Sequence, residues 1–133
     1  MEILSGKFTL TLAEGSFPLS TDSMVLADFV KLPRTARVLD LGSGCGTLGL
    51  LLCAKDDGCT VTGIELTENA HLCALQNIRS NMLEGRLYSI CADLRSMPPE
   101  TKPGSFDLCV SNPPYFSGGE LSRKTPLARR EDC

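Results

Sequence analysis

The chain has 133 residues, of which 42% are hydrophobic and 22% charged, and its formal net charge is −3. This size fits one domain, and the composition excludes collagen-like, coiled-coil and disordered proteins. An acidic chain is also atypical of a sequence-independent nucleic-acid binder. No apolar run approaches the ~20 residues that a membrane-spanning helix needs, and no secretion leader begins the sequence, so we expect a cytoplasmic protein without a membrane partner.

The first 20 residues are assigned to an N-terminal hairpin, because Phe8–Ser20 mixes β-forming residues with Gly15 and Pro18. A helix is predicted over Asp22–Leu32. Its inner face is expected to carry Val25, Leu26, Phe29 and Val30.

Four apolar runs then alternate with helical or loop segments. The predicted strands are Val38–Leu41, Cys59–Leu66, Leu87–Leu94 and Phe106–Ser111. Helices are predicted over Thr47–Lys55 and over Thr67–Asn81, the second with Thr67 as its N-cap. Its apolar positions are Leu72, Leu75, Ile78 and Met82. Such alternation is typical of an α/β protein with a doubly wound parallel sheet.

A doubly wound sheet usually has five or more strands, whereas segment 117–133 is polar and rich in Gly and Pro, without a further predicted strand. We therefore expect residues 1–133 to be an incomplete domain, truncated after about four core strands. An unpaired strand would leave an open sheet edge through which the chain could self-associate.

Seven cysteines are spread through the sequence without a Cys-x-x-Cys pair. Their odd number argues against a disulfide scaffold, and their spacing argues against zinc. We expect reduced thiols and no metal site. The only histidine, His71, lies among polar positions and is expected to face solvent without a functional role.

A glycine-rich loop, Asp40–Gly46, joins the first predicted strand of the sheet to the following helix. Glycines allow a tight turn and close approach of a ligand, and the helix N-terminus presents free N–H groups. Glu65 ends the next strand, where a carboxylate can accept hydrogen bonds from both hydroxyls of a ribose. Together they predict a cofactor that contains adenosine.

Two such cofactors fit the spacing. Gly44–Gly49 also satisfies the dinucleotide pattern G-x-G-x-x-G, which would suit NAD. Asp40 favours S-adenosyl-L-methionine, because a buried carboxylate needs a cationic partner and that cofactor carries an ammonium and a sulfonium. The alternative is that Asp40 caps backbone N–H groups of the loop.

Four polar residues stand at the carboxyl ends of the four predicted strands: Asp40, Glu65, Asp93 and Asn112. Ligands of parallel sheets bind outside these ends, so we expect the four side chains to converge on one crevice.

Asn112–Tyr115 is the sequence Asn-Pro-Pro-Tyr. The two prolines stiffen the backbone and leave two acceptors, the Asn112 amide oxygen and the Pro113 carbonyl, beside an aromatic ring. Such an edge suits a planar amine: the two oxygens accept hydrogen bonds from its N–H groups while Tyr115 stacks on its plane. The alternative is an ordinary proline turn that ends the strand.

Over residues 18–131 these features resemble the class I S-adenosylmethionine-dependent methyltransferases of the amino-group, Asn-Pro-Pro-Tyr type. Thr21–Ala27 is similar to the leading motif of their methyltransferase small domain group. Within that group the chain resembles the bacterial tRNA (valine) adenine-N6 methyltransferases, in which Ser-Gly-Gly and Ala-Arg-His-Glu motifs follow the catalytic loop. The corresponding residues are Ser117–Gly119 and Ala128–Glu131, with Arg130 in place of the histidine.

The resemblance implies a Rossmann-like fold and methyl transfer to an exocyclic amino nitrogen, adenine N6 of a tRNA. It implies cofactor contacts at Thr21, Asp40, Leu41, Gly42, Gly44, Gly46, Glu65, Leu66, Asp93, Leu94 and Asn112. The catalytic residues that it implies are Asn112, Pro113, Pro114 and Tyr115, and the substrate contacts are Tyr115, Phe116, Arg129 and Arg130. Three alternatives remain open: a protein glutamine N5-methyltransferase, an NAD-dependent oxidoreductase and a catalytically inert fragment.

Overall fold

The structure is a computed structural model that describes residues 2–4, 7–13, 21–102 and 104–111. Its elements are, in chain order, β1 (Glu2–Leu4), β2 (Phe8–Leu10), α1 (Thr21–Phe29), β3 (Arg37–Leu41), α2 (Thr47–Lys55), β4 (Thr60–Glu65), α3 (Glu68–Ser80), β5 (Leu87–Cys91), the 3-10 helix η1 (Pro99–Thr101) and β6 (Leu108–Ser111). The four predicted core strands and the two helices between them are all present.

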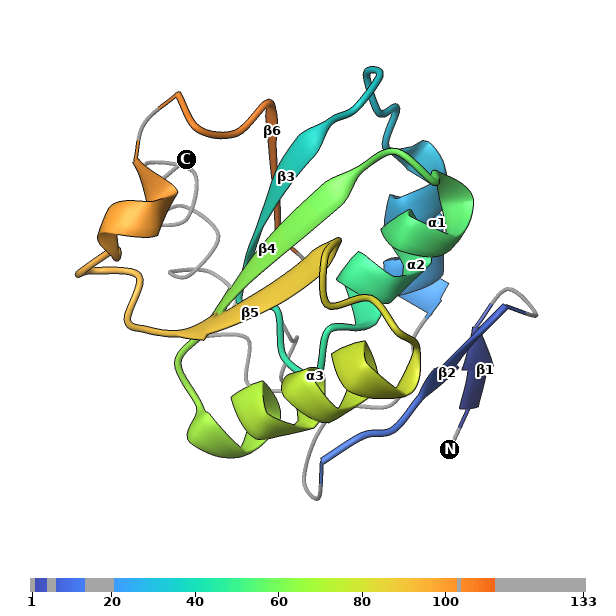
Figure 1. Ribbon diagram of the computed structural model, residues 1–133, viewed down its shortest axis with the longest axis horizontal. Helices are drawn as coiled ribbons and strands as arrows, with labels where there is room; N and C mark the ends of the chain where they lie inside the picture. Colours follow the sequence, from blue (N-terminus) through green and yellow to red (C-terminus); the bar gives the residue numbers. More distant parts are fainter. Residues whose placement is uncertain (1, 5–6, 14–20, 103, 112–133) are drawn as a thin grey trace.

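A four-stranded sheet with the order β5-β4-β3-β6 forms the centre of the molecule, and every neighbouring pair is parallel. The register aligns Asp40 of β3 with Gly63 of β4 on one side and with Val110 of β6 on the other. Because all four strands run in the same direction, their carboxyl ends lie at one edge of the sheet (Figure 1). The predicted α/β fold with a parallel, Rossmann-like sheet is confirmed.

The two faces of the sheet are covered differently. Helices α1, α2 and α3 lie on one face, whereas the segment that contains η1 lies on the other (Figure 1). The larger core cluster joins the inner sides of the helices to sheet residues such as Val38 and Val61. The smaller cluster, on the opposite face, consists of Leu39, Leu41 and Ile64.

The N-terminal hairpin pairs β1 with β2, and both strands lie within the first 20 residues; residues 14–20 lie outside the described part. The inner face predicted for α1 is wrong in part, since Val25 and Phe29 are 58% and 80% exposed. Among the described side chains of this helix, Ser23 and Ala27 are buried, on a helix that packs against α2.

Helix α3 is also rotated from the predicted orientation. Leu72 and Met82 are exposed, whereas the buried face of the helix carries Cys73, Ala74, Asn77 and Ile78. Thr67 is the N-cap, as predicted, although its side chain makes no capping hydrogen bond. His71 is half-buried, and its Nδ1 lies 2.8 Å from the Ser89 Oγ, so the prediction that it faces solvent is wrong.

Lys55, in the last turn of α2, ties that helix to α1. Its Nζ donates to the carbonyl oxygens of Ala27 and Asp28 at 2.9 and 3.1 Å and also to that of Val30. These carbonyls belong to the C-terminal end of α1, where unpaired oxygens and the helix dipole favour a cation. Lys55 therefore caps α1 from a neighbouring helix.

Cys45, Cys53, Cys59 and Cys73 are buried free thiols, and Cys91 is an exposed one. Cys109 is disulfide-bonded, so the expectation of reduced thiols is wrong for that residue. Within the described ranges there is no cluster of side chains suited to a metal ion, and none of the helices has the length and apolar character to span a membrane.

Candidate cofactor site

The glycine loop turns through three glycines in the left-handed region, with φ of 72° at Gly42, 59° at Gly44 and 89° at Gly46. Residues with a Cβ avoid this conformation, which explains why glycine occupies every second position here. The N–H groups of Gly42 and Ser43 both donate to the Ile64 carbonyl, at 2.8 and 3.1 Å. The loop is therefore fastened to the end of the neighbouring strand β4.

Glu65 makes the next connection between β4 and the loop. Its Oε1 accepts from the Gly44 N–H at 2.8 Å, and its Oε2 accepts from the Thr67 N–H at 2.9 Å. One carboxylate thus holds both the glycine loop and the entry to α3. An ionised carboxylate offers about four lone-pair sites, so two acceptor sites are left for ribose hydroxyls.

Gly63 provides the space into which the loop packs. A Cβ at this position would lie 2.5 Å from both the Cβ and the Oγ of Ser43. The Ser43 hydroxyl is buried, and within the described residues it has no hydrogen-bond partner. At Gly44, by contrast, an added Cβ would meet no atom within 4 Å, so the space beside Gly44 is open. Open space beside the half-buried backbone of Gly44 and a carboxylate with spare acceptor capacity fit an adenosine-containing cofactor.

Asp40 lies near the carboxyl end of the central strand β3 and is only 2% exposed. It lies across from Gly63 in the register of β3 and β4, and hence close to the loop. Leu41, which follows, is fully buried in the core. The structure therefore brings Asp40, the loop glycines and Glu65 together at adjacent strand ends.

Asp93 follows the edge strand β5 and is paired with Arg95. Its two oxygens accept from the Arg95 Nε, Nη2 and backbone N–H at 2.7 to 3.2 Å. These bonds hold the pKa of Asp93 at about 2, well below its usual value of 3.8. The Arg95 side chain is 88% exposed, so this ion pair is open to solvent.

The other predicted residues are placed less directly. Leu66 is 67% exposed just after β4, and Leu94 packs against the smaller core cluster. Thr21 begins α1, but its side chain is not described. The predicted catalytic and substrate residues, Asn112, Pro113, Pro114, Tyr115, Phe116, Arg129 and Arg130, lie outside the described residues.

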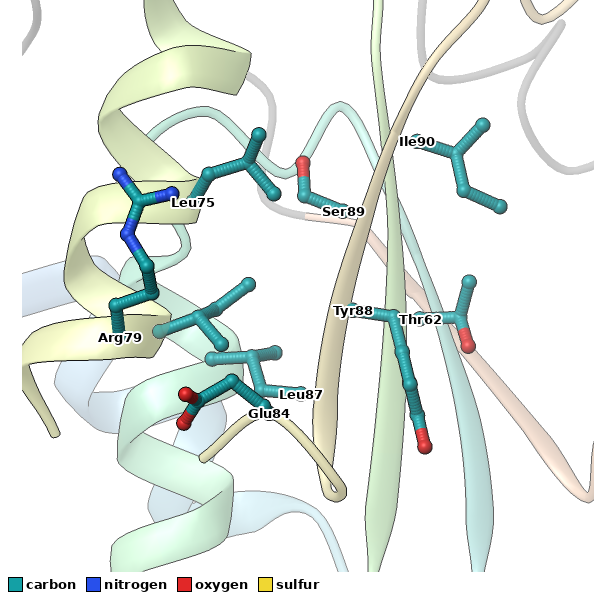
Figure 2. A pocket seen from close by; sticks show the side chains of 9 residues that line it. Thr62, Leu75, Arg79, Glu84, Leu87, Tyr88, Ser89 and Ile90 are labelled. Carbon is teal, nitrogen blue, oxygen red and sulfur yellow. The ribbon is translucent and has the colours of Figure 1, made fainter. Parts of the chain in front are cut away.

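An open cavity of about 560 Å³ lies along β5, and no residue of the glycine loop lines it. Its lining residues come from both sides of the strand: Figure 2 shows Tyr88 and Thr62 on one side and Leu75 of α3 on the other. Asp40, Glu65 and Asp93 do not line it. This cavity is therefore separate from the predicted cofactor site.

Sequence reasoning missed Asn77, a 1% exposed residue of α3 whose Nδ2 donates to the Cys45 carbonyl in the glycine loop at 2.8 Å. The available indication was its place in the helix: Asn77 follows Cys73 by four positions and precedes Ile78, so it shares their face.

The parallel sheet, the left-handed glycine loop and the acidic residue at the end of the second core strand define a Rossmann-like protein that binds a nucleotide-type cofactor. A family model described as "Methyltransferase small domain" matches residues 18–128. The chain belongs to this family of S-adenosylmethionine-dependent methyltransferases. Family membership decides between the two cofactors that the spacing left open, in favour of S-adenosyl-L-methionine.

Curated relatives include tRNA1(Val) (adenine(37)-N6)-methyltransferases. That of Shewanella halifaxensis is 35% identical over 80% of this chain and 43% of its own length, and that of Aliivibrio salmonicida is 30% identical over 95% and 53%. This chain thus spans about half the length of these relatives. Among solved structures, a SAM-dependent methyltransferase from Thiobacillus denitrificans in complex with S-adenosyl-L-homocysteine matches with a TM-score of 0.61 and 21% identity, over 87% of this chain and 45% of its own.

Proposed function

We propose that the chain transfers a methyl group from S-adenosyl-L-methionine to the N6 amino nitrogen of adenine in a tRNA. The observation that carries the proposal is the fastening of the glycine loop to Glu65, at the edge of the sheet from which β6 leads into Asn112–Tyr115. Membership of the family and the names of its relatives support it. A tRNA substrate implies that the protein acts in the cytoplasm.

In this proposal each residue at a strand end contacts a different part of the cofactor. Glu65 accepts the ribose hydroxyls with the lone pairs that the loop leaves unused. Asp40, which is buried near the end of the central strand β3, faces the cationic methionine portion of the cofactor. Asp93 serves the adenine side, and the exposed Arg95 side chain turns away at little cost because its ion pair is solvated.

When bound, S-adenosyl-L-methionine supplies a methyl group that is activated by attachment to a sulfonium. The part of the protein is to make the target nitrogen nucleophilic. The Asn112 amide oxygen and the Pro113 carbonyl accept hydrogen bonds from the two amino hydrogens, and so stabilise the positive charge that develops on the nitrogen before one of its protons is lost to solvent. Tyr115 and Phe116 stack on the unpaired base. Arg129 and Arg130 contact phosphate.

Incubation of the purified chain with methyl-labelled cofactor and total tRNA tests the proposal. After digestion to nucleosides we expect the label in N6-methyladenosine. An Asn112→Ala variant should lose activity by roughly 10²–10³-fold, as is typical for the loss of one preorganised hydrogen-bonding group. Asn69→Ala, the same change at an exposed position of α3, is the control.

Other distributions of the label separate the alternatives. Label found in added protein and absent from nucleosides would favour a glutamine N5-methyltransferase and contradict the proposal. Binding of S-adenosyl-L-homocysteine without transfer to either substrate would identify the chain as an inert fragment.

A further inference from the structure

Asn77 is a buried polar residue whose hydrogen-bonding groups are directed at two separate segments of backbone. Its Oδ1 accepts from the Thr11 N–H, and its Nδ2 donates to the Thr11 carbonyl, both at 2.8 Å. The same Nδ2 donates to the carbonyl of Cys45, also at 2.8 Å. The two hydrogens of the amide are thereby engaged, one to the N-terminal segment and one to the glycine loop.

Asn81, one helical turn further along, repeats half of this pattern. Its Oδ1 accepts from the Thr9 N–H and its Nδ2 donates to the Thr9 carbonyl, both at 2.8 Å. Thr9 and Thr11 are two residues apart in extended backbone, so their N–H and C=O groups face the same side. The two asparagines therefore hold the N-terminal segment as a neighbouring strand would. The Asn81 Nδ2 also donates to the backbone carbonyl of Asn77. Of the two asparagines, only Asn77 bonds to the glycine loop.

Two thiols reinforce the link between the N-terminal segment and the loop. The Cys73 Sγ donates to the Thr11 carbonyl at 2.9 Å, and the Ala13 N–H donates to the Cys45 Sγ at 3.4 Å. Residues 11–13 thus reach from α3 to the glycine loop.

The Cys45 carbonyl, to which Asn77 donates, belongs to a peptide of the loop that can rotate easily. The Cys45–Gly46 peptide lies between two residues with left-handed backbone, Gly44 with φ of 59° and Gly46 with φ of 89°. Glycine allows such a peptide to rotate at little cost, because φ of either sign is accessible. The bond from Asn77 holds the carbonyl toward α3. The Gly46 N–H then donates to the Ser43 carbonyl at 3.0 Å.

We propose that Asn77 is a positioning residue of the cofactor site. It fixes the Cys45–Gly46 peptide and thereby keeps the glycine loop in the conformation in which the Gly44 N–H donates to Glu65. The consequence for cofactor binding rests on the proposed function, whereas the effect on the loop itself does not. Asn81 docks the same N-terminal segment without touching the loop, and is therefore the matched control.

Amide hydrogen exchange in the unliganded chain, followed by NMR, tests the effect on the loop. We expect the Gly44 and Gly46 amides to exchange about tenfold faster or more in Asn77→Ala, a change that corresponds to the loss of about one hydrogen bond. Asn77→Asp keeps the volume and one acceptor but removes the donor, and should have the same effect. Asn81→Ala should leave both amides at the wild-type rate, although it too loses stability in urea unfolding.

Calorimetric titration with S-adenosyl-L-homocysteine tests the consequence for binding. We expect the Asn77 variants to bind about tenfold more weakly and Asn81→Ala to bind as the wild type does. Unchanged loop exchange in both Asn77 variants, or an equal increase in Asn81→Ala, would overturn the proposal. If the wild type binds no S-adenosyl-L-homocysteine while the Asn77 variants still accelerate loop exchange, the positioning role stands and the proposed function fails.

Discussion

The Glu65 carboxylate and the Gly44 N–H are 2.8 Å apart across the end of the sheet, although 21 residues separate them in the chain. The left-handed conformation of Gly44 directs its N–H toward the end of β4, where the carboxylate accepts a hydrogen bond from it. The bond therefore couples the shape of the loop to the charge that is expected to receive the ribose.

Glu65→Gln should weaken both this contact and cofactor binding. The new amide NH2 cannot accept a hydrogen bond, so one of the two backbone N–H groups loses its partner. We expect the free energy of unfolding to fall by about 1.5–3 kcal/mol, typical of a bond to a charged group, and the Kd for S-adenosyl-L-homocysteine to rise by about tenfold or more. Urea unfolding and calorimetry measure the two effects. Glu84→Gln, at an exposed position outside the helices, should change neither.

Gly63→Ala should destabilise the chain through a collision with Ser43. The added Cβ would lie 2.5 Å from two Ser43 atoms, a separation that forces the loop away from β4. Overpacking of this kind costs about 1–3 kcal/mol. Ser43→Gly removes both colliding atoms, so the double variant should recover much of that loss. Strict additivity of the two single changes in a double-mutant cycle would contradict the collision.

Ser43→Ala should stabilise the unliganded chain, because it removes a buried hydroxyl that lacks a partner among the described residues. Leaving such a group unpaired costs about 1–3 kcal/mol. Ser89→Ala is the opposite case, since the Ser89 hydroxyl is bonded to His71, and it should destabilise the chain. Thermal unfolding of the two variants side by side measures the contrast, and the same sign for both would contradict this account.

The ion pair between Asp93 and Arg95 should depend on pH in the acidic range. Its hydrogen bonds lower the pKa of Asp93 to about 2, so its contribution is fully present above the usual value of 3.8 and is lost as the pH falls toward 2. Arg95→Ala should return the pKa of Asp93 toward 3.8, as followed by carboxyl carbon NMR. The lowered pKa of Asp107, which depends on Arg37, should stay where it is.

Arg86 should be important for the turn that joins α2 to β4. Its guanidinium donates to the carbonyls of Cys53 and Cys59, at 3.5 and 3.2 Å, and to that of Asp56. Arg86→Met keeps the apolar stem and should lower the free energy of unfolding by about 1.5–3 kcal/mol. Arg79→Met, on the exposed face of α3, should change it by less than about 0.5 kcal/mol. Similar losses in denaturant unfolding would rule out the turn as the cause.

The sheet and the loop were predictable because their residues carry strong local preferences. Glycine at 42, 44 and 46 marks left-handed backbone, and an acidic residue after an apolar run, such as Glu65, marks a strand end in a parallel sheet. The orientation of the helices was harder to predict. Phe29 is apolar and yet exposed, because the buried face of α1 carries Ser23 and Ala27 instead.

Asn77 could not be recognised by polarity, because an asparagine in an amphipathic helix is normally assigned to the exposed face. Its partners are backbone groups of Thr11 and Cys45, which carry no side-chain signature in the sequence. The pairing of Asp93 with Arg95 likewise depends on a turn after β5 that brings a neighbouring guanidinium back to the carboxylate.

The contact between Thr9 and Asn81 joins residues that are 72 positions apart. Such a long-range contact closes a large loop of chain, at an entropic cost that is compensated only after the sheet and α3 exist. During synthesis the hairpin leaves the ribosome before the sheet does, yet it can dock on α3 only after most of the sheet has emerged. The hairpin is thus made before the elements on which it docks and completes its folding after them.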